Sequence, residues 1–176
     1  MTASFFIGLT GAIILVLGAA YPIKPVRHPT QSFKNWLFAI GGAFMFTYAL
    51  LNYLNGGPIF FVFLQILVNL AGVLMLANVK ESISASTITL GGVALIVWSL
   101  ALFEDMSTLF FILGLLGISM GYVFKVTSIH RYTALTLGSV LVSTFSYLQG
   151  DMIFFWLNAF FAIFSAYYVW KLGGRK

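Results

Sequence analysis

Cysteine and charged residues are what this sequence has least of. Its 176 residues contain no cysteine, four Asp or Glu and nine Lys or Arg, so that 7% are charged. Soluble domains carry about 25% charged residues, and so few charges cannot cover a chain of this size with a water-soluble surface. The absence of cysteine excludes disulfides, thiolate chemistry and cysteine metal sites. Without an HExxH motif or a catalytic cluster, we expect no enzyme activity, no metal and no cofactor.

Hydrophobic residues make up 61% of the chain, which predicts that lipid is its main solvent. A helix needs about 20 mostly apolar residues to cross the hydrocarbon. Seven apolar segments meet this requirement, at residues 3–21, 35–54, 58–78, 83–103, 107–124, 132–149 and 152–171. The sequence therefore predicts an all-α integral membrane protein of seven transmembrane helices, with little chain left for a soluble domain. The first segment lacks the flanks of a cleaved secretory signal, and we interpret it as a retained helix.

The basic residues all fall on one side of this arrangement. The first, third and fifth loops and the C-terminal tail, with the adjoining helix ends, hold Lys24, Arg27, Lys34, Lys80, Lys125, Arg131, Lys171, Arg175 and Lys176. Because basic loops stay in the cytoplasm, we predict an outer N-terminus and a cytoplasmic C-terminus, in the plasma (inner) membrane of a prokaryote. The net charge of +5 then serves topology, and we expect no nucleic-acid partner.

Residues 1–80 and 106–176 share short matches in the same order. Both contain a Phe-Phe-Ile segment, a His-Arg pair, two adjacent small residues, a Tyr-containing turn and an Ile-Phe-Phe segment. The matched segments are Phe5–Ile7 with Phe110–Ile112, Arg27-His28 with His130-Arg131, Gly41-Gly42 with Gly138-Ser139, and Ile59–Phe61 with Ile153–Phe155. The order predicts two parallel three-helix repeats, 1–80 and 106–176, joined by a linker helix at 81–105 (3+1+3). The alternative is a chance likeness between two apolar triplets.

Amide and hydroxyl side chains inside the spans are candidates for binding a solute. An amide that faces lipid leaves its donors and acceptors unpaired, so these side chains should face the protein interior. The candidates are Asn69, Asn158, Gln65, Tyr48, Asn52, Ser143 and Tyr147, of which several pairs are four residues apart and share a helix face. The alternative is that these groups only join helices, at about 0.6–2 kcal/mol each.

The spans contain no ionisable Asp, Glu, Lys, Arg or His near their middle. Proton-coupled carriers and voltage sensors need such groups at depth. The sequence therefore favours downhill movement of an uncharged solute. The expected partners are the lipid bilayer and a small polar solute, and the sequence leaves a homo-oligomer open.

The 3+1+3 arrangement resembles the SWEET and PQ-loop superfamily of small transporters. The segment Tyr147–Asn158 is similar to the SWEET pattern of an aromatic residue, an Asp and an Asn seven residues later, and Asn69–Gly72 resembles the family Asn-x-x-Gly. The resemblance implies that Asn69 and Asn158 face each other across a pathway for a sugar, used by alternating access. The chain departs from the family in lacking a PQ dipeptide and the helix prolines, and Val142 or Thr144 replaces the family tryptophan. Vitamin or nucleoside transporters of the PnuC type, and receptors or assembly proteins of the KDEL-receptor type, are the alternatives.

Overall fold

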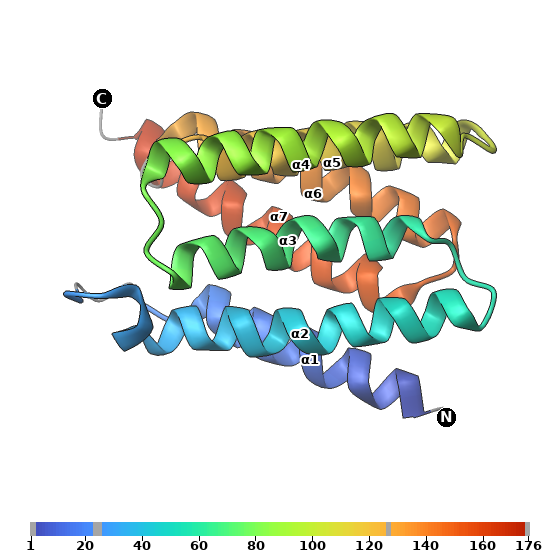
Figure 1. The fold of residues 1–176 in the computed structure, drawn as a ribbon, viewed down its shortest axis with the longest axis horizontal. Coiled ribbons are helices and arrows are strands. Elements are labelled where there is room, and N and C mark those ends of the chain that lie inside the picture. Colours follow the sequence, from blue (N-terminus) through green and yellow to red (C-terminus); the bar gives the residue numbers. More distant parts are fainter. Residues whose placement is uncertain (1–2, 23–25, 126–127, 175–176) are drawn as a thin grey trace. The chain divides into compact units, whose positions relative to one another are not determined.

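The computed structural model describes residues 3–22, 26–125 and 128–174, and this part of the chain is helical, without a strand (Figure 1). Its elements are α1 (Ala3–Ala20), the short 3-10 helix η1 (Pro29–Gln31), α2 (Phe33–Leu54), α3 (Phe60–Leu76), α4 (Glu81–Ala101), α5 (Met106–Val123), α6 (Ile129–Leu148) and α7 (Met152–Gly173). Each α-helix coincides with one predicted apolar segment. The prediction of an all-α chain with seven helices is therefore confirmed for the described residues.

Five of these helices, α1, α2, α4, α5 and α7, are long and apolar enough to cross a membrane. The apolar helix α3 is shorter, with 17 residues, which span about 25 Å at 1.5 Å per residue. The remaining helix, α6, carries many Ser and Thr residues. These helices are consistent with a membrane-embedded protein, while the count of seven crossings and their orientation stay predictions. Lys24, Arg175 and Lys176, which the charge pattern assigns to the cytoplasm, lie outside the described residues.

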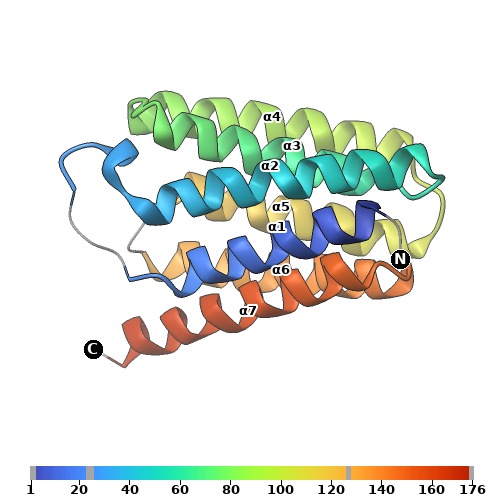
Figure 2. The same ribbon diagram turned by 90° about the horizontal axis from the view of Figure 1, so that it is seen from below.

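The chain divides into two compact units, Met1–Ser84 and Ala85–Lys176. In the first unit α2 packs against both α1 and α3, and η1 lies against α2 and α3. In the second unit α6 packs against both α5 and α7 (Figure 2). The second helix of each trio is thus the central one. Most of α4 belongs to the second unit, and its role as a linker stays a prediction.

Aspartate side chains cap the N-termini of two helices in the second unit. A carboxylate oxygen of Asp105 accepts hydrogen bonds from the backbone N–H groups of Ser107 (2.8 Å) and Thr108 (3.2 Å). The Ser107 hydroxyl also donates to it, and this hydrogen bond is the main reason that the pKa of Asp105 is lowered. Asp151 accepts from the N–H of Phe154 at 3.0 Å. These caps satisfy N–H groups that have no partner within the helix.

The turn between α2 and α3 is a Schellman motif. The N–H of Gly56 donates to the Tyr53 carbonyl at 3.0 Å, and the N–H of Gly57 donates to the Asn52 carbonyl at 2.9 Å. Gly56 has a φ of +91°, a left-handed conformation that glycine adopts without steric cost. The helix therefore ends at this glycine and the chain reverses within a few residues.

The turn between α6 and α7 has the same hydrogen bonds. The N–H of Gly150 donates to the Tyr147 carbonyl at 3.0 Å, and the N–H of Asp151 donates to the Ser146 carbonyl at 2.9 Å. Gly150 has a φ of +73°. Both units thus join their second and third helices by one kind of turn, with glycine at the same left-handed position.

A leucine packs into the space above a glycine where the first and second helices of each unit meet. A Cβ atom placed on Gly41 of α2 would lie 2.8 Å from the Cγ atom of Leu15 in α1. In the second unit the residue types are exchanged, because a Cβ atom on Gly121 of α5 would lie 2.5 Å from the side chain of Leu135 in α6. A side chain larger than hydrogen at either glycine would force the leucine side chain to move.

We predict that Gly138→Ala destabilises the protein. A Cβ atom on Gly138 would lie 2.7 Å from the Ile118 nitrogen and 2.8 Å from the Gly114 oxygen, and backbone atoms cannot move away as a flexible side chain can. Such overpacking costs about 1–3 kcal/mol. Gly72→Ala is the matched control, because a Cβ atom there meets nothing within 4 Å and alanine favours a helix by up to about 1 kcal/mol.

The measurement is the thermal unfolding temperature of both variants in detergent. Gly138→Ala should unfold at a lower temperature than the parent protein, and Gly72→Ala at the same or a higher one. Equal unfolding temperatures for the two variants would contradict the close approach of α5 and α6.

Candidate functional site

Asn69 joins α3 to α2. Its amide nitrogen donates to the Gly42 carbonyl across the helix interface at 3.2 Å and to the Gln65 carbonyl of its own helix at 2.8 Å. An Asn amide has two N–H donors, so both are used. Its oxygen lies against Gly42, where an added Cβ atom would approach it to 2.9 Å. The side chain therefore fits a close contact between two helices, which is the joining role that the sequence left as an alternative to solute binding.

Gln65 lies one helical turn before Asn69 and is buried, with 3% of its surface exposed. The Oε1 atom of its side chain has no hydrogen-bond partner among the described residues. The preceding turn of α3, Phe61 to Leu64, is also buried and purely apolar. An unpaired buried acceptor costs about 1–3 kcal/mol. Gln65 is therefore a polar group that the neighbouring protein leaves unsatisfied.

Two candidate residues of the second unit bond to adjacent carbonyls of α7. Ser143 of α6 donates its hydroxyl to the Phe155 carbonyl at 3.1 Å, which joins the two helices. Asn158 is buried, with 5% of its surface exposed, and its amide nitrogen donates to the Phe154 carbonyl at 2.8 Å. The first turn of α7 thus accepts hydrogen bonds from both candidate side chains.

The remaining candidates lie in different surroundings. Tyr48 is buried in α2, and Asn52 is half-buried, with its amide against Gly57 of the turn, where an added Cβ atom would lie 2.8 Å from the Asn52 oxygen. Tyr147 is 60% exposed, and its ring packs at 5.6 Å from that of Phe155. Tyr147 therefore does not share the burial of Ser143, although the two residues are four positions apart.

A pair of basic residues that sequence reasoning assigned only to topology has a structural role. Lys34, in the first turn of α2, donates to the Ala19 carbonyl at 3.1 Å and the Tyr21 carbonyl at 2.8 Å, at the end of α1. Arg131, in the first turn of α6, donates to the Phe124 carbonyl at 3.3 Å, at the end of α5. A cation at a helix C-terminus satisfies carbonyls that have no partner within the helix. In the sequence, this role is indicated by a basic residue two or three positions after the serine that caps the second helix of each unit.

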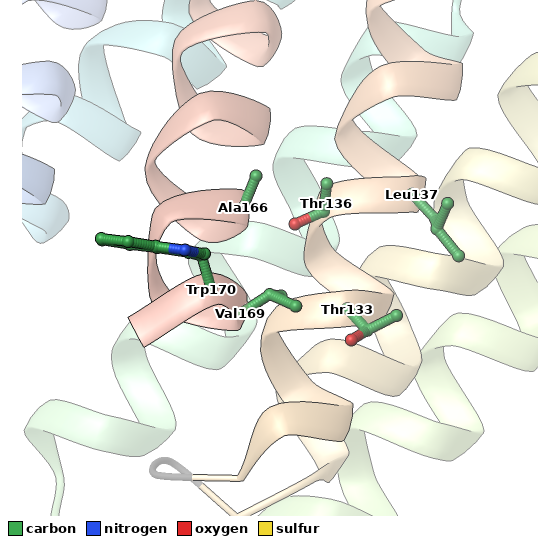
Figure 3. A pocket seen from close by; sticks show the side chains of 6 residues that line it. All are labelled: Thr133, Thr136, Leu137, Ala166, Val169 and Trp170. Atoms are coloured by element: carbon green, nitrogen blue, oxygen red, sulfur yellow. The ribbon is translucent and has the colours of Figure 1, made fainter. Parts of the chain in front are cut away.

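Two grooves on the second unit contain none of the predicted site residues. One, of about 250 Å³, lies between α6 and α7 and is lined by Thr133, Thr136, Leu137, Ala166, Val169 and Trp170 (Figure 3). The other, of about 160 Å³, lies between α4 and α5. Their linings are mainly apolar, which is expected of helix surfaces in contact with lipid. Neither groove offers a set of polar groups for a solute.

Comparisons with protein families, with curated proteins and with solved structures found no match to this chain. The resemblance to the SWEET and PQ-loop superfamily consequently stays a prediction, and the functional argument depends on the geometry of the chain itself.

We predict that Asn69→Ala destabilises the protein by about 1–2 kcal/mol, because it removes the hydrogen bond to Gly42 that joins α2 and α3. Asn55→Ala is the matched control, since the exposed Asn55 amide donates only to the Leu51 carbonyl of its own helix. Thermal unfolding in detergent measures both variants. A stability of Asn69→Ala equal to that of Asn55→Ala would show that the amide does not hold the helices together.

Proposed function

We propose that this chain is a facilitative carrier for a small, neutral, polar solute, built from two copies of one three-helix unit with α4 as the linker. The observation that carries the proposal is that the same hydrogen-bonded turn joins the second and third helices of both units. Secondary transporters are commonly built from internal repeats, and the two units of a parallel repeat share one orientation in the membrane.

The sequences of the two turns support a common unit. Residues 53–61 read Tyr-Leu-Asn-Gly-Gly-Pro-Ile-Phe-Phe, and residues 147–155 read Tyr-Leu-Gln-Gly-Asp-Met-Ile-Phe-Phe. Six of these nine positions are identical at a shift of 94 residues. The turn glycines with positive φ, Gly56 and Gly150, are one of the identical pairs. A chance likeness of apolar segments does not require the same backbone hydrogen bonds at the same positions.

The packing of the first two helices in each unit supports the same register. At the shift of 94, Gly41 of α2 corresponds to Leu135 of α6, and these residues pack against Leu15 and Gly121 respectively. Leu15 and Gly121 are 106 positions apart, as are Gly11 and Gly117. Gly11 packs against Phe44, and Gly117 packs against Gly138. Phe44 and Gly138 are 94 positions apart, as are Gly41 and Leu135. Both contacts therefore give the same alignment, with a shift of 106 residues between α1 and α5 and of 94 residues between α2 and α6.

This register changes which polar residues correspond. It pairs Gly138 with Phe44, so the match of Gly41-Gly42 with Gly138-Ser139 read from the sequence is displaced by three residues. It aligns Asn158 with Leu64, the residue before Gln65 in the sequence. Asn69 aligns with Ile163, which is 64% exposed. We assign solute contact to two buried amides, Gln65 in the first unit and Asn158 in the second, and a joining role to Asn69.

The surroundings of these side chains favour a neutral solute. Gln65 and Asn158 are amides, and α3 contains no charged residue. A carrier without ionisable groups at depth has no site for proton coupling, so the proposed movement is downhill, by alternating access. Amides supply hydrogen bonds in place of water without the strong attraction of a full charge, which suits a site that must also release its solute.

The test is uptake into liposomes, screened over sugars, vitamins and nucleosides. The protein should accelerate equilibration of at least one solute over empty liposomes. Asn158→Leu should lower that rate at least about tenfold, the effect of losing about 1.4 kcal/mol of binding, because it removes the amide. Leucine is chosen because Leu64 occupies the corresponding position of the first unit.

Asn55→Leu is the control, since the Asn55 side chain is exposed. Equal rates for Asn158→Leu and Asn55→Leu with every transported solute would refute the role of Asn158. If no solute crosses faster than in empty liposomes, the carrier proposal itself is refuted.

The orientation is tested separately by labelling single cysteines with a membrane-impermeant maleimide, because the chain contains no cysteine of its own. Cysteine at the exposed positions Asn55 or Gln149 should react in intact cells, and cysteine at Gln31 or Ala77 only after permeabilisation. The charge pattern predicts this result, since the basic loops remain in the cytoplasm. The reverse labelling would overturn the outer N-terminus.

A further inference from the structure

Among the side-chain nitrogen and oxygen atoms of the described residues, Oε1 of Gln65 is the one that is buried without a hydrogen-bond partner. Native proteins pair most buried polar groups, and an exception usually marks a function or a bound molecule. The backbone carbonyl of the same residue is satisfied, because Asn69 donates to it at 2.8 Å. Of the two oxygen atoms of Gln65, only the one in the side chain therefore lacks a partner.

No donor of the described residues forms a hydrogen bond with this oxygen. Asn69 uses both of its N–H groups on the carbonyls of Gln65 and Gly42. The residues from Phe60 to Leu64 are Phe, Val and Leu, and they carry no side-chain donor. Lipid tails offer none either. A bound molecule can supply the donor that the described residues do not.

We infer that Gln65 is a specificity-determining residue whose Oε1 atom accepts a hydrogen bond from a hydroxyl or N–H group of the transported solute. This inference rests on the proposed carrier function and narrows its substrate class. Such an acceptor favours polyols, sugars or amides that retain a free donor, and it rejects analogues in which that donor is methylated or absent. A site built around a hydrogen bond discriminates strongly against a solute that leaves its buried group unpaired.

A metal ion does not fit this oxygen as well as a donor group does. Divalent cations bind several oxygen ligands, commonly carboxylates. The described residues contain no group of three or more His, Asp or Glu side chains that could hold a metal. A permanently bound water remains the alternative occupant, and it would need 2–4 polar partners.

The first arm of the test is thermal unfolding of the solute-free protein in detergent. Gln65→Met keeps the length of the side chain and removes the unpaired oxygen. Its unfolding temperature should rise by about 2–4 °C, the shift expected for about 1 kcal/mol in a chain of this size. Gln31→Met, a change of the same type at an exposed position, should leave the temperature unchanged. A lower unfolding temperature for Gln65→Met would show that a fixed partner, such as a water, already satisfies the oxygen.

The second arm measures recognition of the best-transported solute and its mono-O-methyl or N-methyl analogues. Added solute should raise the unfolding temperature of the parent protein and of Gln31→Met, and at least one methylated analogue should fail to do so. The parent should also take up the solute at least tenfold faster than that analogue. In Gln65→Met this ratio should fall below about twofold, because the acceptor that reads the donor is gone.

The two arms separate this inference from the carrier proposal. Uptake that continues with unchanged selectivity in Gln65→Met would overturn the inference and leave the carrier standing. If no screened solute is taken up but one of them stabilises the parent protein and not Gln65→Met, the carrier proposal is overturned and Gln65 remains assigned to recognition of that solute. Neither stabilisation nor uptake by any solute would overturn both.

Discussion

In each unit, main-chain carbonyls accept hydrogen bonds from the side chains of a neighbouring helix and add to the apolar packing between the helices. Lys34 and Arg131 donate to carbonyls at the ends of α1 and α5, while Asn69 joins α3 to α2 and Ser143 joins α6 to α7. Asn69 and Ser143 lie inside predicted spans, where no water is available to their polar groups. Each central helix is therefore joined to both of its neighbours by at least one polar contact.

Glycine makes these contacts geometrically accessible. The Asn69 amide reaches the Gly42 carbonyl because no side chain stands in its way. The exchange of leucine and glycine between the two units has the same basis, since one large and one absent side chain fill the interface equally well whichever helix carries them. Similar packing can therefore persist while the residues at corresponding positions differ, which is why the likeness between the units is clearer in contacts than in aligned letters.

Much of the fold follows from the sequence by simple rules. The apolar segment predicted at 35–54 corresponds to α2 at Phe33–Leu54, and the other helices agree similarly, because hydropathy and turn residues determine where a helix can lie. The candidate site is less accessible to such rules. A sequence shows that Asn69 needs a partner, but the carbonyl within its reach depends on how closely α2 and α3 approach.

The same limitation applies to side-chain direction. Ser143 and Tyr147 are four residues apart, and we predicted one inward stripe for both. Four residues turn a helix by about 400°, so the second side chain is offset by about 40° from the first. Near the end of α6 this offset accompanies the change from a buried serine to a tyrosine that is 60% exposed. The unpaired oxygen of Gln65 likewise depends on which donors the folded chain brings near it, and the sequence does not show this.

The two glycine turns have a further consequence for biogenesis. Each turn is closed by hydrogen bonds between residues at most five positions apart, so nothing distant in the chain is needed to form it. Contacts this local form early in folding. The α2–α3 pair can therefore form its reversal while the ribosome is still adding the residues of the second unit, and the α6–α7 pair can form its own without waiting for the first unit to fold.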